Sequence, residues 1–177
     1  YPFNINTLAP KNPVADLMLK NDRATSRDFI GNADVDYQVH GFEDLRLHAT
    51  AGADIAEGKQ NTDVEPTSPL AFYYGSTGFK KSLKRNLLFN AYAQYYHDFK
   101  DKYQHHFDIM AGYEWQHFWR KETSRYLSYY PKTNSMHPGE INTDSGQDYD
   151  GDGKKEDYKY MTENYLVSFF GRANWNW

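Results

Sequence analysis

The segment 107–119 reads FDIMAGYEWQHFW, and it sets a strict condition on the fold. From Phe107 to Trp115 every second residue is apolar or aromatic, and most residues between them are polar or small. A period of two is typical of a β-strand whose two faces meet different surroundings. At ~3.3 Å per residue the segment would extend about 40 Å, roughly twice the length of a common strand in a soluble sheet. Any fold for this chain must therefore accommodate unusually long strands.

Other segments of similar length alternate in the same way, which predicts an antiparallel, all-β chain of about five strands. Short turns near Gly41 and Asp101 would join neighbouring strands into hairpins. The connecting segments contain Gly, Pro, Ser and Asn and are predicted to be loops. The other predicted strands are 28–40, 44–56, 86–98 and about 158–177, and the predicted loops are 1–27, 57–85 and 126–157.

The aromatic content favours a surface at a membrane interface. Aromatic residues make up 18% of the 177 residues, including 16 Tyr and 11 Phe, and Trp residues gather near strand ends. Tyr and Trp suit positions where one end of the side chain is apolar and the other is wet. The mean hydropathy of -0.92 and the lack of any long apolar run exclude a transmembrane helix, but alternating strands dilute hydropathy in a membrane barrel. A soluble β-sandwich or barrel with a Tyr-rich core remains the alternative.

Several function classes receive no support from the sequence. The net charge of -4 gives no reason to expect nucleic-acid binding. Cysteine is absent, so a disulfide framework, a thiol nucleophile and a Cys-based metal site are excluded. No catalytic residues are assigned, because the chain contains no nucleophile elbow, zinc-protease motif, phosphate-binding loop or dinucleotide fingerprint. We therefore do not expect an enzyme.

The basic run FKKSLKR admits two interpretations. Its four cations form a solvated loop flank, or they meet anionic headgroups or phosphate. The cations are Lys80, Lys81, Lys84 and Arg85.

An acidic loop, DYDGDGKKED, resembles the opening of a calcium-binding loop. Three aspartates alternate and are followed by Gly153, as in the D-x-D-x-D-G pattern. The twelfth position is Lys159 rather than the usual bidentate Glu, so a complete EF-hand is not expected. Either the loop binds Ca²⁺ weakly, or it is an acidic tip that binds no ion. The candidate ligands are Asp148, Asp150, Asp152 and Glu156.

Three longer stretches resemble a known family. They read NPVADLMLKNDRATSRDFIGNADVDYQV, FDIMAGYEWQHF and NYLVSFFGRANWNW. In this order they are similar to the SusC/RagA branch of the TonB-dependent outer-membrane transporters of Bacteroidetes. Trp175 and Trp177 stand where the family usually has Tyr, and either residue suits an aromatic girdle.

The resemblance implies that residues 1–177 are a segment of one large transmembrane β-barrel in the bacterial outer membrane. The family's barrel has about 22 strands and holds a plug in its lumen. The plug, the TonB box and the remaining strands have no counterpart in these residues. The short turns would be periplasmic and the long loops extracellular.

The resemblance also implies import of an oligosaccharide or peptide. Partners would be a SusD-like surface lipoprotein, TonB through parts outside this chain, and outer-membrane lipid or lipopolysaccharide. The alternative function is that of a soluble, aromatic-rich β-domain that binds glycans, with or without calcium. Detergent dependence would separate the two hypotheses, because an isolated barrel segment exposes sheet edges and a lipid-facing surface.

Two groups of side chains carry the remaining predictions. Loop aromatics would contact substrate or lid, or would pack against neighbouring loops. These are Tyr73, Tyr74, Tyr129 and Tyr130. Apolar strand residues would face lipid, because the outer wall of a barrel is apolar at mid-height. These are Ala33, Val35, Tyr37, Leu45, Leu47, Leu87, Phe89, Ile109 and Trp115.

Overall fold

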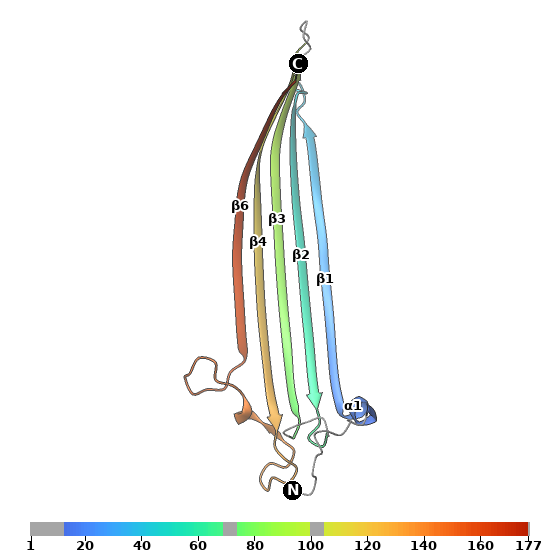
Figure 1. The fold of residues 1–177 in the computed structure, drawn as a ribbon, viewed down its shortest axis with the longest axis vertical. Helices are drawn as coiled ribbons and strands as arrows, with labels where there is room; N and C mark the ends of the chain where they lie inside the picture. The colour runs from blue at the N-terminus through green and yellow to red at the C-terminus, as the bar shows by residue number, and fades with distance from the viewer. Residues whose placement is uncertain (1–12, 69–73, 100–104, 177) are drawn as a thin grey trace. The chain divides into compact units, whose positions relative to one another are not determined.

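A computed structural model describes residues 13–68, 74–99 and 105–176, and nearly all of its regular structure is β-strand (Figure 1). A single short α-helix precedes the first strand in the described part of the chain. The elements are α1 (Pro13–Leu19), β1 (Lys20–Gln38), β2 (Leu45–Val64), β3 (Ser76–Asp98), β4 (His106–Tyr129), β5 (Ile141–Asn142), the 3-10 turn η1 (Thr143–Ser145) and β6 (Tyr158–Asn176).

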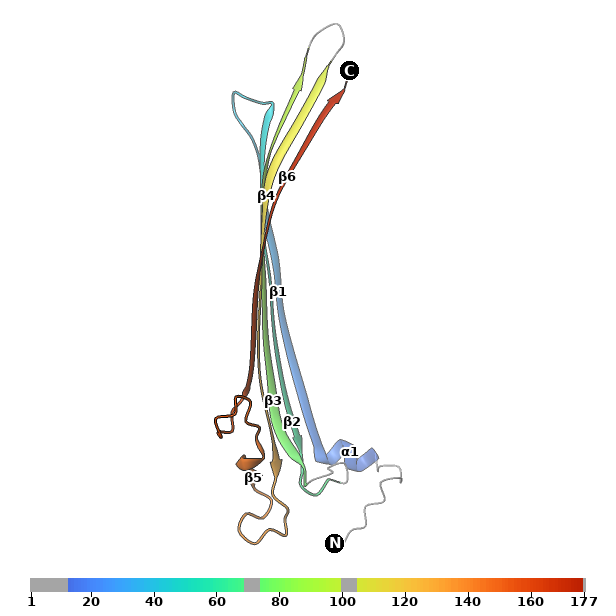
Figure 2. The same ribbon diagram turned by 60° about the vertical axis from the view of Figure 1, so that its left-hand side comes forward.

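The strands form one antiparallel sheet in which β1 to β4 lie side by side in chain order. The order is β1-β2-β3-β4, and both β5 and β6 pair with β4 (Figures 1 and 2). Two-residue β5 pairs with the end of β4 through Ser128↔Asn142 and Tyr129↔Ile141. The prediction of an antiparallel, all-β chain is confirmed.

The β1–β2 turn is short, as predicted. The N–H of Val39 donates to the carbonyl of Leu45 at 3.0 Å, and the N–H of Phe42 donates to the carbonyl of Val39 at 3.1 Å. Gly41 has φ 81°, a left-handed conformation that glycine adopts without strain. The β3–β4 hairpin is closed by the N–H of Phe99 on the carbonyl of His105 at 2.9 Å. Asp101, the centre of the other predicted turn, lies outside the described residues.

The predicted loop boundaries were wrong, because the strands extend beyond the segments in which apolar residues alternate. β2 continues to Val64 and β3 begins at Ser76, so most of the predicted loop 57–85 is strand. Likewise β4 continues to Tyr129, and the predicted loop 1–27 contains α1 and the start of β1. These extensions are polar on both faces, so they show no apolar alternation even though their backbone is paired in the sheet.

The chain divides into two compact units, each of which we describe by itself. The loop-side unit comprises residues 1–27, 57–83 and 121–160, and it includes α1, β5 and the long connections. The turn-side unit comprises residues 28–56, 84–120 and 161–177, and it includes the two short hairpin connections.

Neither unit has a buried apolar core in its described residues. No hydrophobic side chain there is buried, and Ser68 and His117 are the buried polar side chains, each 5% exposed. A soluble sandwich would bury apolar side chains between two sheets, and the described strands instead belong to a single sheet. No helix among the described residues is long and apolar enough to cross a membrane.

Candidate functional site: a sheet with two unlike faces

In the turn-side unit, one face of the sheet is apolar and aromatic. Odd-numbered residues of neighbouring strands meet on this face: the rings of Tyr113 and Phe169 lie 5.3 Å apart, and those of Phe107 and Trp175 lie 6.4 Å apart. A shallow depression on the face is lined mainly by small or apolar side chains. They include Val35, Tyr37, Leu47, Ala49, Ala91, Ala93 and Ala111.

The nine residues that the sequence assigns to a lipid-facing surface are all odd-numbered and lie in strands of this unit. Several are strongly exposed despite their apolar character; Val35 is 61% exposed and Tyr37 is 53% exposed. A large exposed apolar surface marks a site that another apolar body covers. Contact with lipid stays a prediction that this exposure supports.

The opposite, even-numbered face of the turn-side unit is polar. Thr50 Oγ1 donates to Asp34 Oδ1 at 2.6 Å, and Asn86 Nδ2 donates to Asp54 Oδ2 at 3.0 Å. A further carboxylate, Asp108, accepts from Gln94 at 2.9 Å and from Arg172 at 3.0 Å. Hydrogen-bonded carboxylates and amides of this kind suit a face that borders water, such as the lumen of a barrel.

His117 forms a polar cluster within the apolar face. Its Nε2 lies 2.8 Å from Glu163 Oε1, which also accepts from the hydroxyl of Tyr165 at 2.8 Å. The imidazole stacks on Tyr165 with ring centroids 4.5 Å apart, and it is also near Trp115 at 5.8 Å. Sequence reasoning did not single out His117, although its odd number and its place two residues after Trp115 put it on that face.

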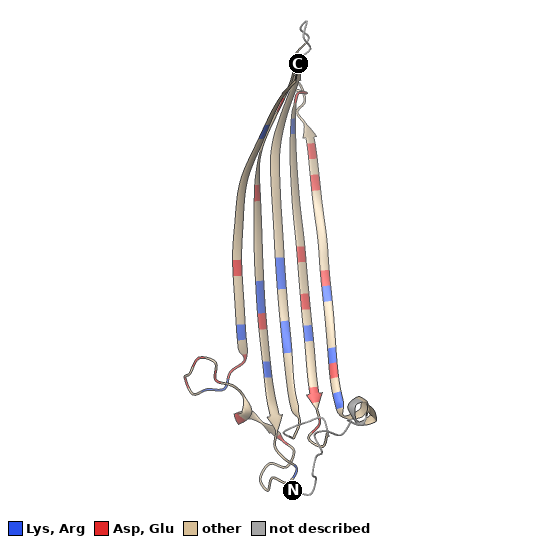
Figure 3. Cartoon of the chain, in the orientation of Figure 1, with Lys and Arg blue, Asp and Glu red and all other residues tan. Residues whose placement is uncertain are grey.

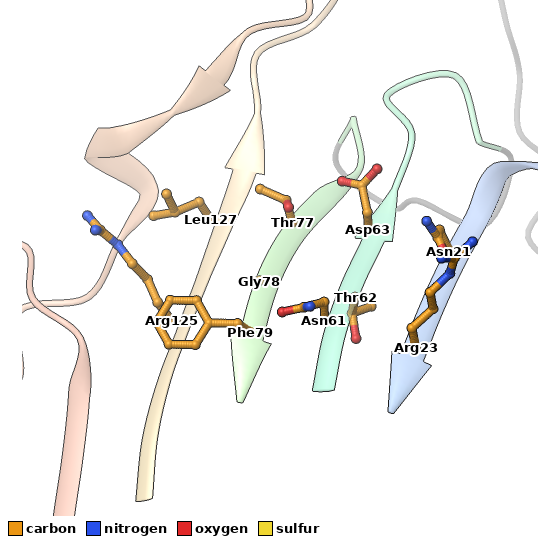
Figure 4. Close-up of a pocket in the computed structure, with 10 residues that line it drawn as sticks. All are labelled: Asn21, Arg23, Asn61, Thr62, Asp63, Thr77, Gly78, Phe79, Arg125 and Leu127. Carbon is orange, nitrogen blue, oxygen red and sulfur yellow. The ribbon is translucent and has the colours of Figure 1, made fainter. Parts of the chain in front are cut away.

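In the loop-side unit, the odd-numbered face is polar and charged. It holds a cavity of about 470 Å³ whose walls come from β1, β2, β3 and β4 (Figure 4). Arg23, Asn61, Asp63, Thr77 and Arg125 contribute polar groups to it. No sequence signal marks this cavity, because its residues come from four strands and are adjacent only through strand pairing.

Two pairs of side chains lie beside this cavity, Tyr129 with Asp63 and Arg125 with Asp157. The hydroxyl of Tyr129 donates to Asp63 Oδ1, which joins the end of β4 to β2. Arg125 Nε lies 3.6 Å from Asp157 Oδ1, and both atoms are buried without a hydrogen-bond partner. The ion pair therefore rests on electrostatic attraction alone in this arrangement.

The predicted loop aromatics have different surroundings. Tyr73 lies outside the described residues. Tyr74 is 41% exposed and has φ 63°, which is uncommon for a residue other than glycine. Tyr129 is engaged with Asp63, and the ring of Tyr130 stacks on His137 with centroids 5.4 Å apart. Tyr129 and Tyr130 thus contact neighbouring side chains, while Tyr74 presents its side chain to solvent, and contact of any of them with substrate or lid stays a prediction.

The acidic loop brings three of its four candidate ligands together. One carboxylate oxygen from each of Asp148, Asp150 and Asp152 lies within 4.8 Å of the others. Glu156 is not part of this group among the described residues. Hard carboxylate oxygens in such proximity are a ligand set that suits Ca²⁺.

The same carboxylates already accept hydrogen bonds from their own loop. Asp148 accepts the N–H groups of Gly151 and Gly153 at 2.7 and 2.8 Å, and Asp152 accepts Lys154 Nζ at 2.7 Å. The N–H of Gly153, and then that of Gly151, lowers the pKa of Asp148 below its ordinary value. The Lys154 side chain lowers the pKa of Asp152 in the same way. The loop is thus stabilised in its ionised form by groups of the chain itself.

Comparison with known proteins places these faces in context. No protein-family model matches the chain. The chain is 40% identical over 176 residues to a protein of Bacteroides thetaiotaomicron named TonB-dependent receptor SusC, and the match covers 99% of this chain and 16% of that protein.

Solved structures agree in fold. The RagAB peptide importer in its closed-closed state matches with a TM-score of 0.68 at 18% identity, over 89% of this chain and 16% of the matched chain. Its open-open state matches with a TM-score of 0.67 over the same shares. At this identity the likeness concerns the fold. The chain spans 16% of the length of the proteins that it matches, and over that segment it is a homologue of the TonB-dependent receptor SusC.

Proposed function

We propose that this chain forms part of the wall of a TonB-dependent transporter that imports nutrients through the bacterial outer membrane. The observation that carries the proposal is the 40% identity to SusC over 176 residues. The separation of an apolar and a polar face on the same strands supports it, because a membrane barrel needs one face for lipid and the other for its lumen.

The proposed role of the segment is structural and selective rather than chemical. Strands paired along their length satisfy their backbone groups within the sheet, which is a condition for crossing hydrocarbon. The hydrogen-bonded carboxylates and amides of the even-numbered face would line the path of the solute. We expect transport without any change in the solute's covalent bonds, and thus no enzymatic activity.

The substrate class is an oligosaccharide or a peptide. RagAB is described as a peptide importer, whereas the stronger sequence match is to the receptor SusC. Tyr74 is the best-placed loop aromatic for contact with a substrate or lid, because its side chain is exposed. Tyr129 and Tyr130 would support that surface from within through their contacts with Asp63 and His137.

The proposed partners follow from the same relatives. They are a SusD-like surface lipoprotein that covers the transporter, TonB acting through parts of the receptor outside this chain, and the lipids of the outer membrane. Calcium binding by the acidic loop stays a prediction. The proximity of Asp148, Asp150 and Asp152 is compatible with it, and so is the network of internal hydrogen bonds without an ion.

Uptake by the complete receptor tests the proposal. The gene for the full-length protein would be deleted, and uptake of labelled oligosaccharides and labelled peptides would be compared with that of the parent and of a complemented strain. We expect loss of uptake for one of the two classes and restoration by the complete gene. Unchanged uptake of every oligosaccharide and peptide in the panel would contradict the proposal.

A further inference from the structure

The even-numbered face of the loop-side unit has no net charge and is rich in hydroxyl groups. Its described strand residues include two cations and two carboxylates, and Figure 3 marks the charged positions along the strands. The same face holds five Ser, one Thr and three Tyr. Each hydroxyl can both donate and accept a hydrogen bond. The face therefore suits a polar solute without net charge.

On this face, Tyr126 of β4 extends across the neighbouring strand β3. A Cβ added at Gly78 would meet Cδ1 of the Tyr126 ring and would lie 2.9 Å from its Cε1. The ring thus occupies the space that a side chain at position 78 would need. Tyr126 is nevertheless 51% exposed. Because Gly78 has no side chain, an aromatic ring can lie against β3 with much of its surface open to a solute.

Hydrogen-bonded polar groups occupy the adjacent strands on the same face, and we call them the Asp22 cluster. Gln60 Nε2 and Thr62 Oγ1 of β2 both donate to Asp22 Oδ1 of β1, at 2.9 and 3.2 Å. Lys20 Nζ lies 3.9 Å from Asp22 Oδ2 and offsets its charge. The Asp22 side chain remains 35% exposed. The cluster is therefore held in place and can still accept hydrogen bonds from a solute.

Strand register places the Asp22 cluster next to the aromatic ring. A Cβ added at Gly58 of β2 would lie 2.8 Å from Ser82 Oγ of β3, so these two residues are opposite one another. Because partners move in opposite directions along antiparallel strands, Thr62 lies opposite Gly78. Figure 4 shows these two residues on neighbouring strands. The ring over Gly78 is therefore one strand spacing, ~4.8 Å, from the cluster.

Further exposed tyrosines stand on the same face at the start of β6. Even-numbered residues of β4 and β6 share a face, as the contact of Asp108 with Arg172 shows. Tyr158 and Tyr160 are even-numbered and are 38% and 42% exposed. The ring of Tyr149 lies 5.2 Å from that of Tyr158. A solute with repeated units can therefore contact more than one aromatic ring.

We propose that Tyr126 and the Asp22 cluster form a subsite for one sugar unit of a neutral oligosaccharide. A pyranose presents C–H groups on its faces and hydroxyl groups around its edge, so it needs an aromatic surface with donors and acceptors beside it. Tyr126 supplies the surface, and Asp22 and Gln60 supply the polar groups. The inference rests on the proposed function, which assigns the even-numbered face to the path of the solute, and it narrows the substrate class.

A peptide fits this subsite less well. A peptide backbone binds most readily to an unpaired strand edge. Thr62 and Gly78 lie in β2 and β3, which are paired on both sides. Their backbone groups are therefore engaged within the sheet, and recognition at this place depends on side chains.

The test measures the binding of defined probes to the complete receptor in nonionic detergent by calorimetry. The probes are neutral hexasaccharides, each built from one kind of hexose, and capped hexapeptides without charge. Tyr126→Ala removes the ring, and Tyr126→Phe keeps it. Phe79→Ala is the matched control, because it removes a ring from the opposite face of the same unit, one residue from Gly78. Mobility on heating in detergent gels verifies that each variant is folded.

We expect Tyr126→Ala to weaken the binding of the preferred hexasaccharide about tenfold, with Tyr126→Phe and Phe79→Ala changing it less than about threefold. Asp22→Asn should weaken the same sugar about threefold or more, because a charged acceptor forms the stronger hydrogen bond. Unchanged binding in Tyr126→Ala, or equal weakening in Phe79→Ala, would overturn the proposal. An effect confined to the hexapeptides would assign the ring to peptides, and the absence of binding to every hexasaccharide would also overturn the subsite.

Uptake in cells separates this inference from the proposed function. Cells that carry Tyr126→Ala should import the preferred sugar with a raised KM and a nearly unchanged maximal rate, because the ring acts in binding. Normal transport by the wild type with no effect of Tyr126→Ala contradicts the subsite alone. Absence of uptake of every probe by the wild type contradicts the proposed function itself.

Discussion

The odd-numbered face of the sheet has opposite characters in the two units. In the turn-side unit it presents Val35, Leu47 and Ala91 around an apolar depression, whereas in the loop-side unit it presents cations around a polar cavity. The strands themselves are continuous: β3 runs unbroken for 23 residues and β4 for 24. Strand pairing therefore does not depend on an apolar face.

Strand length gives this difference a physical meaning. A tilted strand of ~9–11 residues is enough to span the hydrocarbon of a membrane. The turn-side unit contains 28–38 of β1 and 45–56 of β2, which match that length. The loop-side parts of the same strands, 20–27 and 57–64, are additional to that length. The turn-side segments are thus long enough by themselves to span hydrocarbon.

A charge introduced on the apolar face should have the largest effect on stability. We expect Ala91→Arg to destabilise the inserted receptor by ~2–4 kcal/mol, because a lipid-facing Arg is costly near the middle of the bilayer. Thr123→Arg is the control on the odd-numbered face of the loop-side unit, with an expected change below ~1 kcal/mol. Denaturant unfolding in lipid vesicles measures both. Equal losses of unfolding free energy at the two positions would contradict the difference between the odd-numbered faces of the two units.

A methyl group at Gly112 should produce the next largest effect. A Cβ there would meet the ring of Phe170 and would lie 2.7 Å from Cβ of Tyr92, so Gly112→Ala forces side chains on the polar face to move. We expect a loss of ~1–3 kcal/mol in the unfolding free energy, as for other overpacked positions.

Gly52 is the matched control for this substitution. At that position the nearest atoms to an added Cβ belong to Leu88 at 3.7 Å, which is ordinary contact. Gly52→Ala should therefore change stability much less than Gly112→Ala. The opposite order would show that the close packing of Tyr92 and Phe170 does not limit the even-numbered face.

The His117–Glu163 pair should contribute a smaller but measurable coupling. A double-mutant cycle with His117→Phe and Glu163→Gln isolates the 2.8 Å contact from the stacking of the ring on Tyr165. We expect a coupling that differs from zero in the unfolding free energy, because one hydrogen bond joins the two side chains. A coupling of zero would mean that the aromatic rings alone hold this part of the apolar face.

The smallest expected effect is weak binding of Ca²⁺ at the acidic loop, which is measured as a binding heat rather than as a change in stability. We expect Ca²⁺ to bind the complete receptor with Kd of ~10⁻⁴–10⁻³ M, because Lys159 replaces the closing Glu. Asp150→Ala should abolish the calcium heat in calorimetry, with Glu156→Ala changing it less because Glu156 is outside the carboxylate group. Equal heats for the wild type and Asp150→Ala would refute a site at this loop.

The loop also predicts a dependence on pH. The pKa of Asp148 is below its ordinary value of 3.8, so its contribution to loop order is complete above that value. The contribution is lost as the pH falls from the ordinary value through the lowered pKa. The protection of the Gly151 and Gly153 amide hydrogens from exchange, relative to the intrinsic exchange rate at each pH, should fall only in that range. A loss of protection that begins near neutral pH would implicate another group.

The sequence predicted the strands where their two faces differ. Alternation of residues such as Val35 and Leu47 identified the apolar face, and the hairpin turn at Gly41 followed from turn chemistry. Strand segments with two polar faces show no such alternation, so β2 was predicted to end too early and β3 to begin too late. The run FKKSLKR illustrates the consequence: it lies inside β3, and its four cations are divided between two faces.

The candidate sites were predictable only where their residues are close in sequence. The acidic loop was found because Asp148, Asp150 and Asp152 are separated by single residues. The cavity beside Arg125 depends on which strand lies beside which. That information belongs to strand order and register, and no local pattern contains it.

The single-sheet arrangement has a consequence for how such a wall is assembled. Among the described strands, β1 pairs only with β2, and β6 pairs only with β4, so each leaves one line of backbone N–H and carbonyl groups without a strand partner. Unpaired peptide groups cost several kcal/mol each in hydrocarbon. Because no apolar side chain is buried among the described residues, we expect the two edges to pair with neighbouring strands of the receptor as the sheet enters the bilayer.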